Sequence, residues 1–303
     1  MSGAAPSILA IHSGALGDVV LFGRLLEQLG APVTLAAGRE KADLLAWAGV
    51  AAKPLDFDSL PLHELFIPGQ APVTLREKLG CHDRLISCFG GGHGQAEEAL
   101  RRLVGGAAHF LPIRPPADGP DHLVAIWQRQ LGLPPLRRWP AWTPAADSRP
   151  LAQAALAEAG LDPAQPYAVL HAGAGAADKC WPLERFMELG RLLRPRMQVV
   201  FTLGPVEAER WDPSRIQSLR RDFAVLLAPE LKTLAAVLAH CSRYVGNDSG
   251  VSHLAAAMGA ATLALLGPTR AEHFAPLGPA VKTLSAARME DISLQEAFAA
   301  LRE

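Results

Sequence analysis

Three short segments of this sequence bring small residues together with side chains that can move a proton or bind an anion. They are residues 12–18 (HSGALGD), 171–182 (HAGAGAADKCWP) and 246–253 (GNDSGVSH). Each follows a short apolar run and precedes a helical pattern, so each predicts a turn from a strand into a helix. In an open sheet of parallel strands, such turns lie at the carboxyl ends of the strands, where these sheets bind ligands.

In the first segment, Asp18 falls at the predicted start of a helix, directly after Gly17. A carboxylate in the first helical turn can accept backbone N–H groups and stabilise the helix by about 0.5–2 kcal/mol. The same carboxylate can act as a general base that takes a proton from a substrate hydroxyl. The spacing alone is compatible with both interpretations.

The second segment has the features of an anion site. Gly173 and Gly175 leave backbone N–H groups accessible before a helix, and Lys179 adds a cation. Asp178 and Cys180 flank that lysine where a Walker A loop has Gly and Ser or Thr, and Asp178 also replaces the third glycine of G-x-G-x-x-G. A plain tight turn with an exposed lysine is the alternative.

In the third segment, Asp248 or Ser249 is placed to cap the helix that follows. The backbone N–H groups from about residue 249 to residue 252, including those of Gly250 and Val251, would then be available to an anion. The pattern lacks the G-x-S-x-G spacing of a hydrolase nucleophile elbow. His253 fits a packed helix histidine.

The elements that position these segments alternate between short apolar runs and helical patterns, which is typical of βαβ units with a parallel sheet. We expect strands at residues 7–12, 33–37, 84–89, 167–171, 198–203, 244–246 and 262–266. We expect helices at residues 18–29, 40–48, 95–104, 183–193, 232–241 and 249–258, and a last helix that opens with a capping box at residues 293–296.

A proline-rich stretch, residues 132–150, interrupts this alternation. Because proline lacks a backbone N–H, we expect no interior of a regular element there, and we place a linker in it. A chain of 303 residues favours about two domains. The predicted domains are residues 1–145 and 146–303.

Composition narrows the classes of function. Half of the residues are apolar, 19% are charged and the net charge is −1, which disfavours disorder and a general nucleic-acid binder. We find no apolar run of bilayer length and no signal sequence, and therefore expect a cytoplasmic protein. The four cysteines show neither zinc-binding nor disulfide spacing, so neither a zinc site nor a disulfide is expected.

Taken together, the segments resemble the heptosyltransferase family, glycosyltransferase family 9, which transfers heptose from an ADP-sugar to the inner core of lipopolysaccharide. Residues 14–19 (GALGDV) are similar to the family's S-x-L-G-D-[VI] start, and residues 171–182 to its glycine loop ending in K-x-W-P. Residues 247–254 (NDSGVSHL) resemble its D-[ST]-G-x-x-H-L motif, and residues 267–269 (GPT) its G-P-T.

This resemblance implies an α/β protein of the GT-B fold, in which two Rossmann-like domains with parallel sheets face a central cleft. The first domain would bind a lipopolysaccharide-core or other glycan acceptor, and the second a nucleotide-sugar donor. The reaction would be an inverting transfer from an ADP-sugar, without a metal or other cofactor. Nucleic acid is not an expected partner, and peripheral contact with the inner membrane is compatible with such a protein.

The resemblance also assigns roles. Asp18 would be the catalytic base and, with Gly17, would contact the acceptor, while Lys179 would stabilise the departing diphosphate. The residues assigned to the donor are Gly173, Gly175, Lys179, Glu207, Asp248, Ser249, Gly250, Val251 and His253. Glu207 would meet the ribose hydroxyls, and the purine would lie near residues 229–231.

Two departures from the family pattern keep other functions open. Ala174 and Ala176 stand where relatives usually carry Ser or Thr, and residues 90–95 (GGGHGQ) replace a polar, arginine-containing acceptor segment. The alternatives are a UDP- or GDP-sugar transferase or epimerase of the same fold, and a non-catalytic nucleotide-binding relative. An NAD-dependent oxidoreductase is disfavoured because the glycine fingerprint is incomplete.

Overall fold

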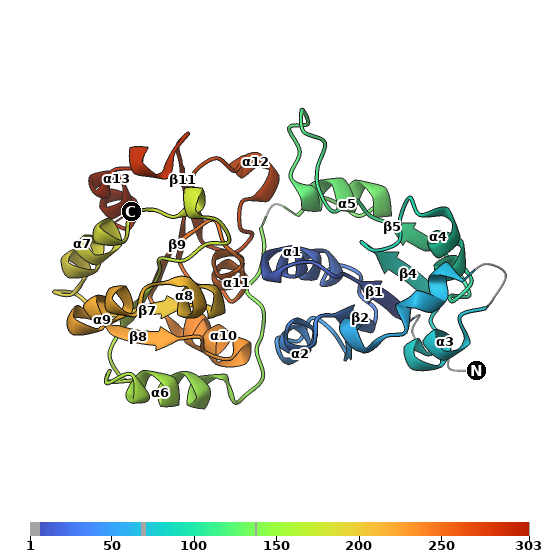
Figure 1. The fold of residues 1–303 in the computed structure, drawn as a ribbon, viewed down its shortest axis with the longest axis horizontal. Helices are drawn as coiled ribbons and strands as arrows, with labels where there is room; N and C mark the ends of the chain where they lie inside the picture. Colours follow the sequence, from blue (N-terminus) through green and yellow to red (C-terminus); the bar gives the residue numbers. More distant parts are fainter. Residues whose placement is uncertain (1–6, 68–70, 137, 303) are drawn as a thin grey trace. The chain divides into compact units, whose positions relative to one another are not determined.

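The computed structural model describes residues 7–67, 71–136 and 138–302, and the chain divides into two α/β units, Met1–Leu136 and Arg137–Glu303 (Figure 1). The predicted boundary, between residues 145 and 146, lies further along the chain than the boundary that the structure shows, between residues 136 and 137. The reason is that the intervening residues pack on the second unit. Trp142 is buried and donates its backbone N–H to the carbonyl of Ala257 at 2.8 Å.

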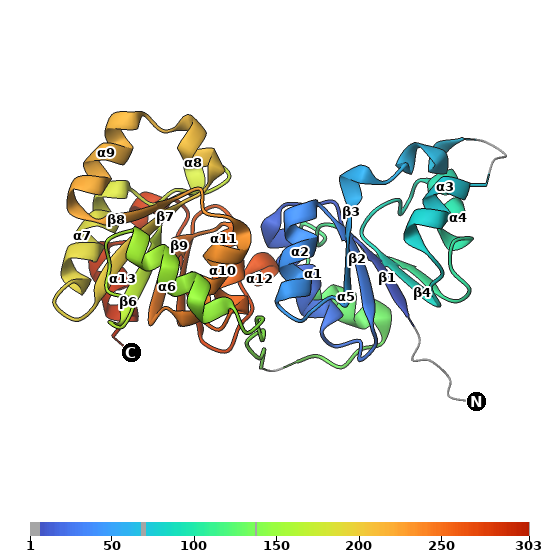
Figure 2. The same ribbon diagram turned by 90° about the horizontal axis from the view of Figure 1, so that it is seen from below.

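The described part of the first unit is a five-stranded parallel sheet in the order β3-β2-β1-β4-β5. Helices α1, α2 and α5 cover one face, and α3 and α4 the other (Figure 2). The strands are β1 (Ile8–Ile11), β2 (Val33–Ala37), β3 (Lys53–Asp56), β4 (Arg84–Ser87) and β5 (Ala108–Phe110). The helices are α1 (Leu16–Leu26), α2 (Arg39–Trp47), α3 (Val73–Leu79), α4 (Gly94–Arg101) and α5 (Leu123–Leu131).

The second unit, over its described residues, is a six-stranded parallel sheet in the order β11-β10-β9-β6-β7-β8. Its strands are β6 (Tyr167–His171), β7 (Gln198–Leu203), β8 (Ala224–Leu227), β9 (Arg243–Asn247), β10 (Thr262–Leu266) and β11 (Val281–Ser285). Its helices are α6 (Ser148–Glu158), α7 (Leu183–Leu193), α8 (Pro205–Arg210), α9 (Pro213–Asp222), α10 (Leu231–His240), α11 (Gly250–Ala257), α12 (Ala271–Phe274) and α13 (Leu294–Ala300).

Alternating strand residues build the core of the second unit. Leu170 of β6 and Phe201 of β7 point to the face where Phe186 of α7 packs, and all three are fully buried. Successive side chains of a strand point to opposite faces. The residues that alternate with Leu170 and Phe201 along these two strands therefore face α6, α10 and α11 on the other side of the sheet (Figures 1 and 2). Central strands buried on both faces explain the continuous apolar runs in the sequence.

Each sheet has one switch point, where connections leave two neighbouring strands in opposite directions. In the first sheet it lies between β1 and β4, and in the second between β6 and β9. Ligands of open α/β sheets bind beyond the carboxyl ends of the strands at such a point. The loops that follow β1, β6 and β9 are the three segments that the sequence analysis singled out.

The predicted strands at residues 33–37, 167–171, 198–203 and 262–266 and the helix at residues 183–193 are confirmed to the residue. The other predicted elements are present with shifted ends, and Ser293 and Glu296 form the predicted capping box. The strands that the sequence analysis did not predict are β3, β5, β8 and β11, which are the edges of the two sheets. Edge strands are only partly buried, so they lack the long apolar run that marks a central strand.

The expectation that residues 132–150 contain no regular element is wrong at its end, because α6 begins at Ser148 and includes Pro150. Proline is tolerated there since N–H groups in the first helical turn have no carbonyl one turn earlier to bond. Among the described residues, no helix is both long and apolar enough to cross a membrane.

Candidate active site

The side chains of Lys179, Asp248 and Thr269 converge at the carboxyl edge of the second sheet. Lys179 Nζ lies 2.7 Å from Asp248 Oδ2, and Thr269 Oγ1 donates a hydrogen bond of 2.6 Å to the same oxygen. The three residues follow β6, β9 and β10. The Lys179 side chain is 34% exposed and that of Asp248 is 10% exposed, so a buried carboxylate holds an ammonium that solvent reaches.

The charge state of Asp248 follows from its neighbours. Burial by itself raises the pKa of this carboxyl, but hydrogen bonds from Lys179 and Thr269, with the charges of Lys179 and His253, outweigh it and lower the pKa. Asp248 is therefore ionised at neutral pH. A charge-assisted hydrogen bond of this kind holds the ammonium at a defined position.

Asn247, the last residue of β9, links the two loops that flank the switch point. Its Nδ2 donates to the carbonyls of Ala172 and Gly173 at 3.0 and 3.2 Å, and its Oδ1 accepts the backbone N–H of Trp181 at 2.9 Å. The side chain is fully buried. One amide therefore holds both ends of the loop that carries Lys179.

The start of α11 offers fewer N–H groups than predicted. Ser249 is the N-cap, and its Oγ accepts the N–H of Ser252 at 3.4 Å. The expectation that Ser252 offers a free N–H is therefore wrong, because the cap uses it. Gly250 and Val251 occupy the first two helical positions, whose N–H groups point out of the helix end. His253, the fourth residue of α11, is buried.

Glu207 packs directly against the glycine loop. It is the third residue of α8, is 4% exposed, and accepts the N–H of Gly204 at 2.8 Å. A Cβ at Gly173 would collide with the Glu207 carboxyl group, so a side chain there would force this buried carboxylate away from the Gly204 N–H. Gly175 differs, since no atom lies within 4 Å of where its Cβ would be.

His171, the last residue of β6, is buried near Glu207. Its Nδ1 donates to the carbonyl of Thr202 at 2.9 Å. Burial lowers the pKa of His171, although the charge of Glu207 acts in the opposite direction. His171 is therefore a neutral, buried link between β6 and β7.

In the first unit, Asp18 is the third residue of α1, and its Oδ2 accepts the N–H of Ala15 at 3.2 Å. The structure thus shows Asp18 as a carboxylate in the first helical turn, which is the first of the two interpretations of this residue. The side chain is only partly buried. Because an ionised carboxylate has about four acceptor sites, this bond leaves room for a substrate hydroxyl.

The loop before Asp18 is held from two sides. His12 Nδ1 accepts the N–H of Gly14 at 2.9 Å, and Lys41 Nζ of α2 donates to the carbonyl of Gly14 at 2.6 Å. Burial lowers the pKa of His12 to about 4, against the effect of Asp18 and with that of Lys41. His12 is therefore neutral at pH 7, and because Nδ1 accepts, Nε2 carries the proton.

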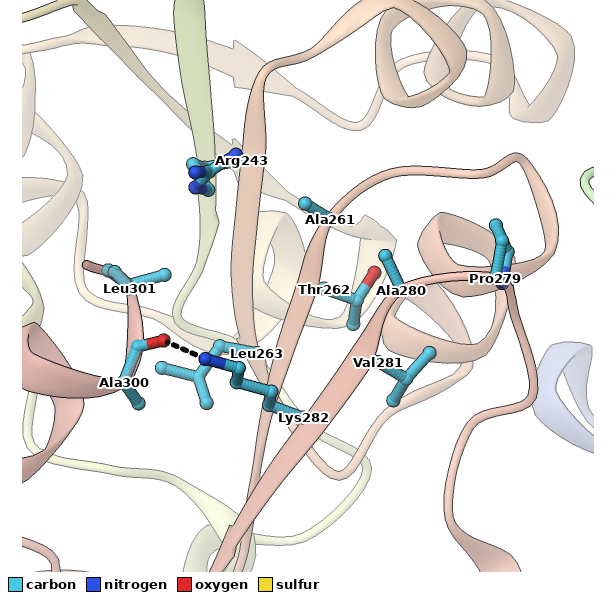
Figure 3. A pocket seen from close by; sticks show the side chains of 10 residues that line it. All are labelled: Arg243, Ala261, Thr262, Leu263, Pro279, Ala280, Val281, Lys282, Ala300 and Leu301. Atoms are coloured by element: carbon cyan, nitrogen blue, oxygen red, sulfur yellow. Dashed lines mark hydrogen bonds between the residues drawn. The ribbon is translucent and has the colours of Figure 1, made fainter. Parts of the chain in front are cut away.

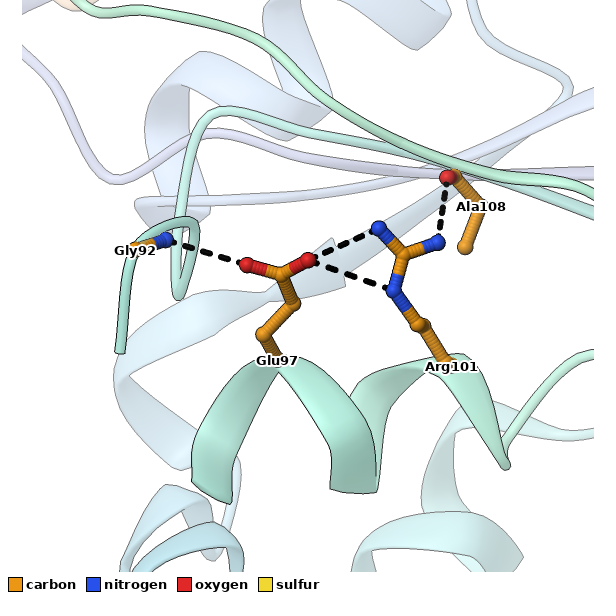
Figure 4. A network of polar contacts seen from close by, with 4 residues as sticks. All are labelled: Gly92, Glu97, Arg101 and Ala108. Carbon is orange, nitrogen blue, oxygen red and sulfur yellow. Dashed lines mark hydrogen bonds and ion pairs between the residues drawn. The ribbon is translucent and has the colours of Figure 1, made fainter. Parts of the chain in front are cut away.

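The glycine-rich segment after β4 is tied to α4. The Glu97 carboxylate accepts the N–H of Gly92 at 3.1 Å and pairs with Arg101 at 2.7 Å, while Arg101 also donates to the carbonyl of Ala108 (Figure 4). The hydrogen bonds from Arg101 and Gly92 lower the pKa of Glu97. Through Glu97, this network places Arg101 beside residues 90–95, the segment that departs from the family pattern.

A pocket of about 290 Å³ lies at the amino ends of strands in the second sheet, at the end opposite to the Lys179 cluster (Figure 3). Its lining includes Arg243, Thr262 and Val281, the first residues of β9, β10 and β11. Since open parallel sheets bind ligands at the carboxyl edge, the Lys179 cluster is the better candidate. Within residues 7–67, 71–136 and 138–302, no three His, Cys, Asp or Glu side chains are grouped to hold a metal ion.

Comparison with protein families identifies the chain. The sequence model of glycosyltransferase family 9 (heptosyltransferase) matches residues 135–299, more than half of the sequence. The chain belongs to glycosyltransferase family 9. The resemblance inferred from the four motifs is therefore confirmed.

Two curated members of the family match part of the chain. The lipopolysaccharide heptosyltransferase 1 of Pseudomonas aeruginosa is 36% identical over 111 residues, which are 37% of this chain and 31% of the relative. The lipooligosaccharide heptosyltransferase 2 of Haemophilus influenzae is 34% identical over 104 residues, 33% of this chain and 30% of the relative. The matches thus span about a third of the curated relatives' length.

Solved structures of the family share the fold. The family 9 glycosyl transferase of Veillonella parvula has a TM-score of 0.77 at 19% identity, covering 100% of this chain and 97% of that one. The ADP-heptose lipopolysaccharide heptosyltransferase II of Escherichia coli has a TM-score of 0.71 at 18% identity, covering 98% and 97%. An Escherichia coli heptosyltransferase solved with ADP has a TM-score of 0.69 at 19% identity, covering 98% and 99%. The predicted GT-B fold class is confirmed.

The structure brings together the predicted donor residues of the second unit. Lys179, Asp248 and the start of α11 share one edge of the sheet, and Glu207 touches Gly173. Gly17 and Asp18 lie at the switch point of the first sheet. The roles assigned to all of these residues remain predictions.

Sequence reasoning missed several residues at these edges. Thr269 stood in the recognised motif at residues 267–269 but was given no role, although a hydroxyl three residues after β10 lies at the carboxyl edge. Asn247 stood inside a recognised motif, but nothing in the sequence showed which groups its amide would reach. Lys41 had no signal, since it lies within a helical pattern and reaches the site only through the packing of α2.

Gly173 and Gly175 form a matched pair for testing the loop. We expect Gly173→Ala to destabilise the protein by about 1–3 kcal/mol through its collision with Glu207. Gly175→Ala should change stability by less than about 0.5 kcal/mol, since its side chain would point into open space. Urea unfolding of both variants measures this, and equal effects would contradict the described packing.

His12 predicts an acid sensitivity of the first unit. The unfolded chain binds this proton near the ordinary pKa of 6.5 and the folded chain only near 4, so stability present above pH 6.5 is lost as the pH falls towards 4. The asparagine in His12→Asn can still accept the Gly14 N–H but does not titrate. We expect this variant to lose about 2 kcal/mol less than the wild type between pH 7 and pH 4.5 in urea unfolding. Parallel pH curves for the two proteins would exclude a buried, neutral His12.

Proposed function

We propose that the protein transfers a heptose from an ADP-sugar to a lipopolysaccharide-core-type acceptor by an inverting, metal-independent displacement. The observation that carries the proposal is the cluster of Lys179, Asp248 and Thr269 beside the start of α11, at the switch point of the second sheet. Membership of family 9 supports this choice of reaction.

In this proposal, the cluster binds the donor's diphosphate. A lysine ammonium has three N–H donors, and the bond to Asp248 uses one, so the others can reach phosphate oxygens. The N–H groups of Gly250 and Val251 and the positive end of α11 add to the binding. As the bond from the anomeric carbon to the diphosphate breaks, the negative charge that collects on the leaving oxygen meets a cation already in place. Losing one such preorganised group typically costs about 10²–10³-fold in rate.

Asp18 is the proposed general base. Its carboxylate takes the proton of an acceptor hydroxyl while that oxygen forms a bond to the anomeric carbon, on the side opposite the diphosphate. One carbon–oxygen bond forms as another breaks, so the configuration at the anomeric carbon inverts and ADP leaves. General base catalysis of this kind contributes about 10²–10⁴-fold.

The relatives support the choice of substrates. The curated proteins that match are named as lipopolysaccharide and lipooligosaccharide heptosyltransferases, and one solved relative is described with ADP. For this chain we propose the same substrate classes, action in the cytoplasm, and peripheral contact with the inner membrane. UDP- or GDP-sugar transfer, epimerisation and nucleotide binding without catalysis are the competing outcomes.

Lys179→Ala tests the donor site. We expect tight binding that is selective for ADP over UDP, GDP, CMP and NAD, and a Kd for ADP at least tenfold higher in the variant because a charged contact to the diphosphate is lost. Titration calorimetry measures both. Lys232→Ala, at an exposed position of α10, is the matched control and should bind as the wild type does. Selectivity for UDP or GDP would replace the donor, and folded protein that binds no nucleotide would refute the transferase.

Asp18→Asn tests the base. The amide keeps the size of the side chain and can still accept the Ala15 N–H, so we expect unchanged ADP affinity and a kcat lower by at least about 10²-fold. Transfer of heptose from ADP-heptose to a core acceptor is the assay. A variant that turns over at the wild-type rate would remove Asp18 from the chemistry.

A further inference from the structure

The peptide group between Gly14 and Ala15 has a charged partner at each end. Its carbonyl oxygen, on Gly14, accepts a hydrogen bond from Lys41 Nζ at 2.6 Å. Its N–H, on Ala15, donates to Asp18 Oδ2 at 3.2 Å. A cation and a carboxylate are therefore joined through a single peptide unit.

We propose that Lys41 is a positioning residue for Asp18 and acts through this peptide. The inference rests on the proposed role of Asp18 as the base. An ammonium on the carbonyl polarises the peptide and makes its N–H a stronger donor, because hydrogen bonds in a chain reinforce one another. The stronger N–H holds Oδ2, and the remaining acceptor sites of the carboxylate then face one direction for a substrate hydroxyl.

The residues around Lys41 allow its side chain to reach the carbonyl of Gly14. The lysine lies in the first turn of α2, and its side chain bends back over the N-cap residue Gly38. A Cβ at Gly38 would lie 2.8 Å from Lys41 Cε, so a side chain there would push the lysine stem out of this path. A lysine on a helix surface usually extends into water. Lys41 is instead partly buried and donates to the loop between β1 and α1.

The loop that receives Lys41 is equally restricted. A Cβ at Gly14 would lie 2.5 Å from His12 Cε1 and 2.9 Å from Asp18 Cβ. The N–H of Gly14 is bound by His12 Nδ1 at 2.9 Å. With the N–H held by His12 and the carbonyl held by Lys41, Gly14 is fixed on both sides and the peptide next to it presents its N–H to Asp18.

Lys41→Met tests the proposal against a matched control. The substitution keeps the length of the stem and removes the ammonium. Lys78→Met removes a similar contact in the same unit, since exposed Lys78 donates to the carbonyl of Ser59 at 2.9 Å. We expect kcat of Lys41→Met to fall about tenfold, which is about 1.4 kcal/mol, with the KM for the sugar donor within about twofold. Lys78→Met should match the wild type, and Lys41→Arg, which keeps a cation, should exceed Lys41→Met in kcat.

A second measurement does not depend on activity. Amide hydrogen exchange at Ala15 should be about tenfold faster in Lys41→Met than in Lys78→Met, because the bond to Asp18 weakens. If both kcat and Ala15 exchange in Lys41→Met equal those of Lys78→Met, or if Lys41→Arg is as slow as Lys41→Met, the positioning role is wrong. The proposed function stands in that case provided that Asp18→Asn still lowers kcat by at least about 10²-fold. If Asp18→Asn transfers normally, the base assignment itself fails.

Discussion

The buried amide of Asn247 is the contact on which the candidate donor site depends. It sits at the end of β9, where it reaches across the switch point to two carbonyls of the loop after β6 and accepts an N–H from the far end of that loop. A buried polar group that loses its partners costs about 1–3 kcal/mol, so the loop is held to one conformation. That conformation carries Lys179 to Asp248, and without it the ammonium would be an ordinary surface lysine.

The first unit holds its catalytic candidate by a different device. There a neutral imidazole and a cation bind the two sides of Gly14, and the neighbouring peptide binds Asp18. Both units thus use glycine for the same reason, which is that a side chain at Gly14 or Gly173 would collide with a neighbouring polar side chain. In each unit the missing side chain of the glycine leaves room for a neighbouring residue. Gly175 differs, because no atom lies within 4 Å of where its Cβ would be.

Much of the fold could be predicted from the sequence, and the strands that were missed have one cause. The central strands are buried on both faces, so their apolar runs stand out, as in β2, β6, β7 and β10. The edge strands form only because a neighbour offers hydrogen bonds, and β11, with mostly exposed side chains, has no run of its own. The boundary between the units was displaced for a similar reason, since Trp142 belongs to the second unit by packing and not by any local pattern.

The sequence by itself determined the alternation of strands and helices, the position of each glycine-containing turn and the family to which the chain belongs. These are local properties, because periodicity, turn residues and motif spacing are set within a few residues. The tertiary structure alone decided which side chains meet: Lys179 with Asp248 and Thr269, Glu207 with Gly173, and Lys41 with the loop of Asp18. Each of these contacts joins residues from different strands or helices, and the order of strands in a sheet, which brings them together, is not written in any single segment.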